Sequence, residues 1–251
     1  MLIEQQKKHY RVLNKWFHSP LGHFAAHEFA VTIDSLNESL RGETVLQLGS
    51  CGDNTWLKKM NYAHKWIASP FALAHKIHIE SELNHLPFSR DSVDCIIAPL
   101  TLEPFGSSFS LIDEIDRVLK PMGLVVFLCI NPWSLWGAAM KCGLLHCYRD
   151  SQVKMRTPFS LNRIFIQRGY EQISLTNFCY IPPVSKASLI KKLTFLDEIG
   201  KMLWPAPSGF YCYVAQKHQL IMPSLMNKSL SQPISDYRPS LQPVTLSPIE
   251  K

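Results

Sequence analysis

The feature that most constrains the fold is the alternation of short apolar runs with segments of helical periodicity. The runs "VDCIIA" (93–98) and "GLVVFLCI" (123–130) are apolar almost throughout, which is typical of strands buried on both faces of a parallel sheet. Between them, apolar residues of 109–120 recur at helical spacing, and "PMG" (121–123) is expected to end that helix. The alternation predicts a doubly wound α/β sheet.

The same patterns predict the other elements in order. Further strands are expected at 44–48, 65–69, 77–81, 171–180 and 209–217. Helices are expected at 22–40, 53–60, 70–76, 131–149, 160–170 and 187–203. Asp53 or Asn54 is placed to cap the second of these helices with its side chain.

Length and composition are those of an ordinary globular protein. The chain has 251 residues, of which 46% are hydrophobic and 18% charged, enough for one domain with a full core. It lacks an uninterrupted apolar run of about 18 residues, and its first residues lack the apolar core of a signal peptide, so we expect a cytoplasmic protein with no transmembrane segment. We expect an N-terminal helical segment (1–42), an α/β domain (43–218) and a disordered Ser/Pro-rich tail (219–251).

Several kinds of site are not supported by the residue spacing. The seven cysteines are odd in number and lack paired spacing, so they are expected to be reduced core residues. The histidines at 75 and 78 and the cluster at 142–147 lack the further ligands that a zinc site needs, so no metal site is predicted. The chain has neither a Gly-x-Ser-x-Gly elbow nor a P-loop lysine, which leaves no basis for a serine hydrolase or an NTPase.

Positive charge is concentrated in the segment 141–168. One acid, Asp150, stands there against six basic residues: Lys141, Arg149, Lys154, Arg156, Arg163 and Arg168. Such a patch could receive an acidic or phosphate-bearing small molecule, or it could be a solvated face. Nucleic acid is a weak alternative, because no recognised binding motif accompanies the charge.

Two stretches resemble a known family. "LPFSRDSVDCIIAPLTLEPF" (86–105) and "LIDEIDRVLKPMGLVVFLCINP" (111–132) are similar to the type-11 branch of the class I S-adenosylmethionine-dependent methyltransferases. Extended to the flanking elements, the resemblance covers about 31–217. It implies a mostly parallel, seven-stranded, Rossmann-like sheet, S-adenosyl-L-methionine as cofactor, and methyl transfer to an acceptor that the sequence does not identify.

The resemblance also implies a cofactor loop, which here departs from the family pattern. The family has an acid at the position of Gln47 and three glycines in alternate positions, of which this chain keeps Gly49. Gly52 could serve as the second glycine if the loop is one residue longer, because glycine adopts positive φ without cost. The residues expected to line the cofactor here are Gln47, Gly49, Ser50, Cys51 and Gly52.

Other cofactor contacts carried over from the family are partly present. Glu82 matches the acid that accepts from the adenine amino group, Leu83 the residue beside it, and Pro99 and Leu100 the strand end beside the methionine part. The acid that normally holds the ribose is missing, because the chain offers Ala68, Ser69 and Pro70 there. Loss of a charged acceptor costs about 1.5–3 kcal/mol, roughly ten- to a hundredfold in affinity.

Catalytic residues are not identified by any motif. Glu103 and Asn131 follow the two central strands at the edge where ligands of such folds bind, so Glu103 could orient or deprotonate an acceptor and Asn131 could hold it. Each could instead be a loop or cap residue, which is the commoner role for such positions. The segment that often covers the acceptor in this family contains Trp133, Trp136, Tyr148 and Arg149, as substrate wall or as core.

The departures in the cofactor loop and at the ribose position favour a rival interpretation. A catalytically inactive protein that keeps the fold as a binding or scaffold module would tolerate these losses. It would also retain "LPFSRDSVD" and "RVLKPMG", which serve a turn, a cap and the core.

Overall fold

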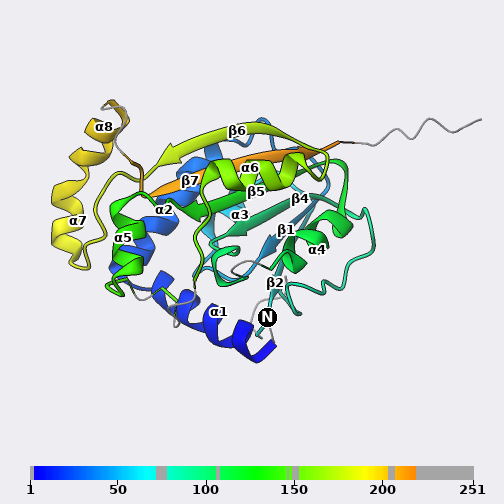
Figure 1. Ribbon diagram of the computed structural model, residues 1–251, viewed down its shortest axis with the longest axis horizontal. Helices are drawn as coiled ribbons and strands as arrows, with labels where there is room; N and C mark the ends of the chain where they lie inside the picture. The colour runs from blue at the N-terminus through cyan, green and yellow to red at the C-terminus, as the bar shows by residue number, and fades with distance from the viewer. Residues whose placement is uncertain are drawn as a thin grey trace, which may run out of the picture. The chain divides into compact units, whose positions relative to one another are not determined.

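The computed structural model describes residues 3–71, 78–105, 108–145, 147–148, 153–202 and 207–218. Its strands form one seven-stranded sheet in the order β3-β2-β1-β4-β5-β7-β6 (Figure 1). The strands are β1 (Thr44–Leu48), β2 (His64–Ser69), β3 (His78–Glu80), β4 (Val93–Pro99), β5 (Leu119–Ile130), β6 (Tyr170–Phe178) and β7 (Phe210–Lys217). The pairs from β3 to β5 are parallel, and β7 runs antiparallel to both of its neighbours. The predicted doubly wound, mostly parallel sheet is therefore confirmed.

Helices cover both faces of this sheet. They are α1 (Ile3–Phe17), α2 (Pro20–Ser35), α3 (Thr55–Lys59), α4 (Ser110–Val118), α5 (Leu135–Lys141), α6 (Pro158–Ile166), α7 (Ala187–Leu193) and α8 (Phe195–Met202), with a 3-10 turn η1 (Glu103–Phe105). On one face, Phe165 of α6 packs against Phe127 and Tyr213 of the sheet. On the other, Phe29 of α2 packs edge-on against Phe178 and Phe210.

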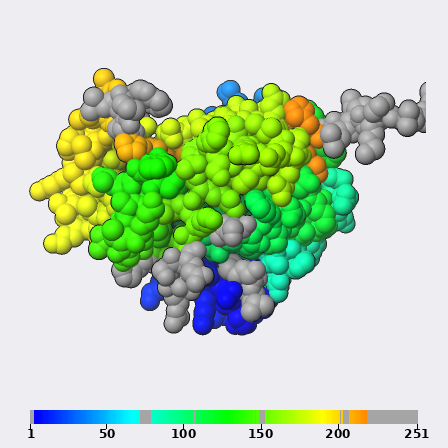
Figure 2. Space-filling view, in the orientation of Figure 1, coloured from blue at the N-terminus to red at the C-terminus, as the bar shows by residue number. Residues whose placement is uncertain are grey.

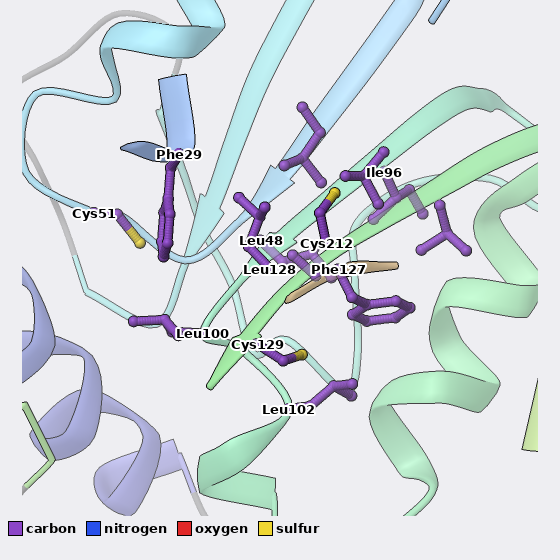
Figure 3. Packing of buried hydrophobic residues seen from close by; sticks show 14 of the residues in the cluster. Phe29, Leu48, Cys51, Ile96, Leu100, Leu102, Phe127, Leu128, Cys129 and Cys212 are labelled. Carbon is purple, nitrogen blue, oxygen red and sulfur yellow. The ribbon is translucent and has the colours of Figure 1, made fainter. Parts of the chain in front are cut away.

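The core between the layers is continuous and apolar. Figure 3 shows part of it, where side chains of β1, β4, β5 and β7 meet Phe29 and the loop residues Cys51 and Leu100. The labelled side chains are all at most 3% exposed. All seven cysteines are free, and six of them are buried, as predicted for reduced core residues; the prediction was wrong for Cys142, which is exposed. In the part of the chain that the structure describes, no helix is long and apolar enough to cross a membrane.

Several predicted element boundaries were wrong. The helix expected through Lys120 ends at Val118, because Leu119 already pairs with Val93 as the first residue of β5. The long helix expected at 187–203 is two helices, α7 and α8, separated at Thr194. In the described part of 131–149 the helix is limited to α5, and the N-terminal helical segment expected at 1–42 contains two helices, α1 and α2, although helical spacing had been assigned there only from residue 22.

Two expectations fall largely on residues that the structure does not describe. The short helix expected at 70–76 lies mostly within 72–77, and the disordered tail expected at 219–251 lies wholly outside the described residues.

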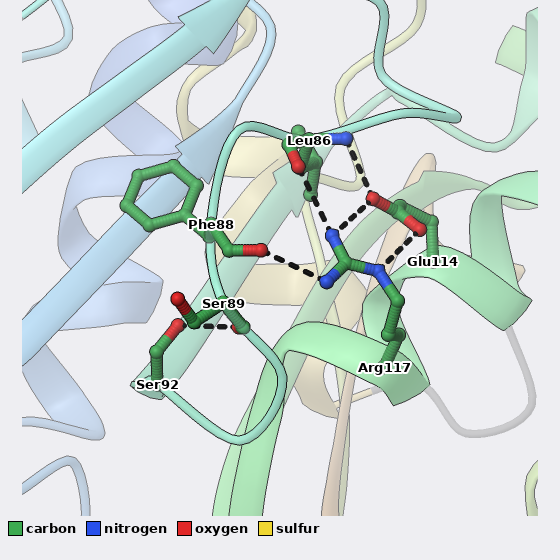
Figure 4. A network of polar contacts seen from close by, with 6 residues as sticks. All are labelled: Leu86, Phe88, Ser89, Ser92, Glu114 and Arg117. Atoms are coloured by element: carbon green, nitrogen blue, oxygen red, sulfur yellow. Dashed lines mark hydrogen bonds and ion pairs between the residues drawn. The ribbon is translucent and has the colours of Figure 1, made fainter.

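The two stretches that carry the family resemblance are tied together by one arginine (Figure 4). The Arg117 guanidinium donates to both carboxylate oxygens of Glu114 at 2.7 and 2.9 Å and to the Leu86 and Phe88 carbonyls at 3.0 and 2.8 Å. The Leu86 N–H in turn donates to Glu114 at 2.6 Å. Burial opposes ionisation of Glu114, but the Arg117 hydrogen bonds hold the pKa of its carboxyl below the ordinary value. The side chains of Glu114 and Arg117 therefore hold the turn that begins at Leu86 against α4.

Candidate functional site

The candidate site lies at the carboxyl edge of β1 and β4. These strands are neighbours, and the chain order runs in opposite directions on either side of them, which makes this the topological switch point where ligands of such sheets bind. Gly49 follows β1 with φ 79° and donates its N–H to the Ala68 carbonyl at 2.7 Å. Gly52 has φ 60°, so both glycines occupy left-handed positions that a side chain would strain.

The loop after β1 is held by an internal network around Gln47. The Gln47 amide donates to the Gly49 carbonyl at 2.8 Å and to Asn54 Oδ1 at 2.5 Å, and it accepts from Trp56 Nε1 at 2.8 Å. Asn54 Oδ1 also accepts the Cys51 N–H at 3.0 Å. Gln47 is fully buried, so its amide shapes the loop from within.

The cap expected for the following helix is absent. Asn54 occupies the N-cap position of α3, but it is left-handed (φ 47°, ψ 46°) and makes no side-chain capping hydrogen bond. Its side chain is instead committed to the loop, since it accepts from Gln47 and donates to the Gly52 carbonyl. Asp53 is exposed and does not cap the helix either.

Cys51 and the end of β4 form the floor of the site. The Cys51 side chain is buried, with Sγ 3.8 Å from the Pro99 carbonyl. Burial, together with the charge of Glu103, raises the pKa of this thiol far above its ordinary value, so it stays protonated. Leu100 has φ 51°, and its carbonyl accepts the Tyr148 hydroxyl at 2.7 Å. Pro99 therefore lies close to the glycine loop, and the expectation that Pro99 and Leu100 lie beside the methionine part of the cofactor stays a prediction.

The adenine and ribose positions lie at the ends of β3 and β2. Leu83 is buried. Glu82, beside it, is partly exposed and lines a surface hollow together with Glu80. Ser69, at the ribose position, is fully buried, and its hydroxyl bonds locally to the Phe71 backbone at 3.3–3.4 Å. The carboxylate in register with Ser69 is Glu80, which lies 3.8 Å from Lys7.

Helix α1 crosses this edge, and its inner side chains contact each part of the site. Gln6 Oε1 accepts the Leu83 N–H at 3.0 Å. The Tyr10 hydroxyl donates to the Thr101 carbonyl at 3.2 Å, and Asn14 Oδ1 accepts the Gly52 N–H at 3.0 Å. A Cβ on Gly49 would lie 2.7 Å from the Tyr10 ring, so the aromatic ring rests directly on the glycine.

The sequence patterns missed these α1 residues. Their signal was the helical spacing of Tyr10, Leu13 and Phe17, all at most 1% exposed, within a segment whose other residues are mostly polar.

Glu103 is a buried carboxyl at the same edge, in η1 after β4. It is 1% exposed; Oε1 accepts the Ile130 N–H at 3.1 Å, and Oε2 has no hydrogen-bond partner among the described residues. Burial raises the pKa of Glu103 to about 7, and the hydrogen bond from Ile130 only partly opposes this. At neutral pH the carboxyl can therefore either accept or donate a proton.

The other expected acceptor-side residues have structural contacts. Asn131 Oδ1 accepts the Trp133 N–H at 3.1 Å in a turn, and Trp133 is 78% exposed. Trp136 is buried against Phe210, with ring centroids 4.7 Å apart. Tyr148 is buried beside the end of β4, and Arg149 lies outside the described residues.

The described basic residues of 141–168 lie on several elements of the structure. Lys141 lies on α5, whereas Arg156 and Arg168 both stack on the Phe109 ring at 5.5 and 5.3 Å. Arg168 also pairs with Asp113 at 2.7 Å, which neutralises its charge locally.

A seven-stranded sheet of this order, with a glycine turn after β1 and an acid after β3, defines the class I methyltransferase architecture. Comparison with known proteins agrees. Residues 56–127 match the family "Methyltransferase domain". They therefore carry a methyltransferase domain of the type-11 branch, set in a class I methyltransferase fold.

Relatives match this chain either in sequence over a short segment or in structure over most of its length. An uncharacterised methyltransferase, YodH, of Bacillus subtilis (strain 168) is 35% identical over 68 residues, which are 27% of this chain and about a quarter (26%) of that protein. A solved S-adenosylmethionine-dependent methyltransferase of Thermotoga maritima, described as a possible histamine N-methyltransferase, has a TM-score of 0.56 at 13% identity, over 81% of this chain and 93% of that one. A Mesorhizobium loti structure of the same class gives 0.52 at 17% identity, over 74% and 96%. The structures share the fold.

In this arrangement α1 already uses several groups of the groove in which proteins of this fold bind their cofactor. The Leu83 N–H and the Gly52 N–H already donate to Gln6 and Asn14, and the Tyr10 ring covers Gly49. Ser69 supplies no carboxylate for a ribose. The residue types of the loops suit a nucleoside, but α1 uses their hydrogen-bonding groups.

Proposed function

We propose that this protein transfers a methyl group from S-adenosyl-L-methionine to an acceptor at the carboxyl edge of β1 and β4. The observation that supports the proposal is that the Gly49 turn and the end of β4 adjoin at the switch point of the sheet, while Glu82 with Leu83 follows β3 in the same parallel part of the sheet. The matched methyltransferase domain includes two of these three parts. Gln47, Ser50, Cys51 and Gly52 would shape the loop around the cofactor.

Glu103 is the residue proposed to act on the acceptor. A buried carboxyl with a pKa of about 7 can take a proton from a nucleophile at neutral pH. Asn131 is proposed as an acceptor-holding residue in the next loop, although its side chain accepts a hydrogen bond in a turn here.

The acceptor is proposed to be an acidic or phosphate-bearing small molecule. The support is Arg156, which is half-buried and lies over the Phe109 ring. Burial and the charge of Glu103 raise the pKa of the core residues Cys129 and Tyr211, and the positive charge of Arg156 opposes that rise in both groups. Free cysteines, six of seven buried, suit a reducing compartment such as the cytoplasm.

A second candidate function is a binding or scaffold module without catalysis. The observation that favours it is the groove itself: its backbone donors are used by α1, and Ser69 stands where a ribose-binding acid is expected. The two functions differ in whether the cofactor binds at all.

Thermal unfolding with S-adenosylmethionine, or with S-adenosylhomocysteine, separates the two. Ligand at a hundred times its dissociation constant adds about 2.7 kcal/mol of stability, which for a chain of this size raises Tm by roughly 5–10 °C. Glu82→Ala is expected to weaken binding at least about tenfold, whereas Glu38→Ala, an exposed acid away from the site, should leave it unchanged. The absence of any shift with either ligand would favour the module.

A further inference from the structure

The inner face of α1 carries polar groups at four-residue spacing, all directed at the groove. Gln6 is fully buried, Tyr10 is fully buried, and Asn14 is partly buried, and each makes a hydrogen bond to a different part of the site. Fully burying an amide side chain such as that of Gln6 is costly unless its hydrogen bonds are satisfied. The positions of these partners therefore determine where α1 can dock.

The contacts of Gln6 have the pattern of an adenine edge. Its amide presents an acceptor and a donor side by side: Oε1 accepts the Leu83 N–H, and Nε2 donates to Asn84 Oδ1. The Watson–Crick edge of adenine presents the same pair, a ring-nitrogen acceptor beside an amino donor. Segment 82–84 therefore offers one set of partners that either group can use.

Asn14 and Tyr10 likewise occupy positions that a ligand would take further along the groove. Asn14 Oδ1 accepts from Gly52 N–H at 3.0 Å and from the Ser50 hydroxyl at 3.3 Å, which are the groups that a ligand on the glycine loop would need. The Tyr10 ring fills the space above Gly49, which has no side chain of its own. Polar and aromatic groups of one helix thus extend from the segment after β3 to the loop after β1.

We propose that α1 is an internal occupant of the cofactor groove, with the Gln6 amide in the place of the adenine edge, so that α1 and the nucleoside of the cofactor exclude one another. The inference rests on the proposed function for the identity of the competing ligand. The chain between α1 and α2 supplies a pivot, because only His18 and Ser19 separate the two helices. Helix α2 stays anchored through Phe29 while α1 leaves.

The first test measures the dissociation constant of S-adenosylmethionine by titration calorimetry on the full chain. If the docked α1 masks the groove, the measured affinity falls with the fraction of molecules that are open. Gln6→Ala removes two docking hydrogen bonds, worth about 1 kcal/mol each, and should then tighten binding about 30-fold; Gln6→Ala/Asn14→Ala, which removes two more, should tighten it further. The matched control is Gln5→Ala, an exposed neighbour on α1, which should bind as wild type does.

The second test measures amide hydrogen exchange of 3–17 with and without the cofactor. Faster exchange in the presence of cofactor is expected, because displaced α1 loses its partners. Slower exchange, or a Gln6→Ala dissociation constant equal to or weaker than that of wild type, would show that α1 is a lid that helps to bind the ligand, and would overturn the inference alone. Absence of binding to every variant, the double variant included, would overturn the proposed function and this inference with it.

Discussion

The buried carboxyl of Glu103 should make the stability of the unliganded protein depend on pH near neutrality. Its pKa is raised from 4.5 to about 7, mainly by burial. Between these two pH values the folded state keeps a proton that the unfolded state has released. The stabilising contribution of protonated Glu103 is therefore complete below pH 4.5 and is lost as pH rises through about 7. A tenfold change in acidity corresponds to about 1.4 kcal/mol, and the whole effect is about 3 kcal/mol.

Glu103→Gln isolates this contribution. The amide cannot ionise, yet its oxygen can still accept the Ile130 N–H. The free energy of unfolding of the variant, relative to wild type, should rise by about 2.5 kcal/mol between pH 5 and pH 8, because only the wild type must bury a charge as pH increases.

Urea unfolding at intervals of half a pH unit measures this difference, with the exposed Glu38→Gln as control. Parallel pH profiles for Glu103→Gln and wild type would refute the reasoning. They would mean that Glu103 ionises at its ordinary pKa, and the carboxyl would lose its suitability as a proton acceptor at neutral pH.

Two further predictions concern the framework of the site. Arg117→Met should lower the free energy of unfolding by about 2–3 kcal/mol, because Glu114, 10% exposed, loses its charged partner. Adding Glu114→Gln should recover part of that loss. Urea unfolding measures both variants, and additive effects of the two substitutions would contradict this prediction. Gln47→Glu, which restores the family's acid, should destabilise by about 2 kcal/mol, because a carboxylate would face the Gly49 carbonyl and Asn54 Oδ1 as a third acceptor. The exposed Gln172→Glu should be neutral, and equal stability of the two variants would show that the loop can rearrange.

The strands and their order of appearance could be predicted because each depends on a local pattern. The apolar runs at 93–98 and 123–130 are long enough to identify buried strands by themselves, and β4 and β5 contain them. Helix ends were less predictable, since the end of α4 at Val118 depends on the pairing of Leu119 with Val93, which no local pattern contains.

The sequence also indicated which loops would form the site, but not how their side chains are used. Gln47 was expected to line the cofactor, and the structure shows that its buried amide accepts a hydrogen bond from Trp56 within the loop. The partner of a glutamine cannot be predicted from the residue type, because an amide bonds equally well to a ligand, a backbone carbonyl or another side chain.

By itself the sequence determined the α/β class and the glycine turn at Gly49, because apolar periodicity and backbone requirements act over a few neighbouring residues; the role of Glu82 came from the family resemblance and stays a prediction. Only the tertiary structure decided that the first helix lies in the groove. The contacts that place it join residues 77, 91 and 38 positions apart: Gln6 with Leu83, Tyr10 with Thr101, and Asn14 with Gly52. Such contacts depend on which surfaces meet once the sheet has formed; the helical spacing of Tyr10, Leu13 and Phe17 indicates a buried face of α1 but not the surface that covers it.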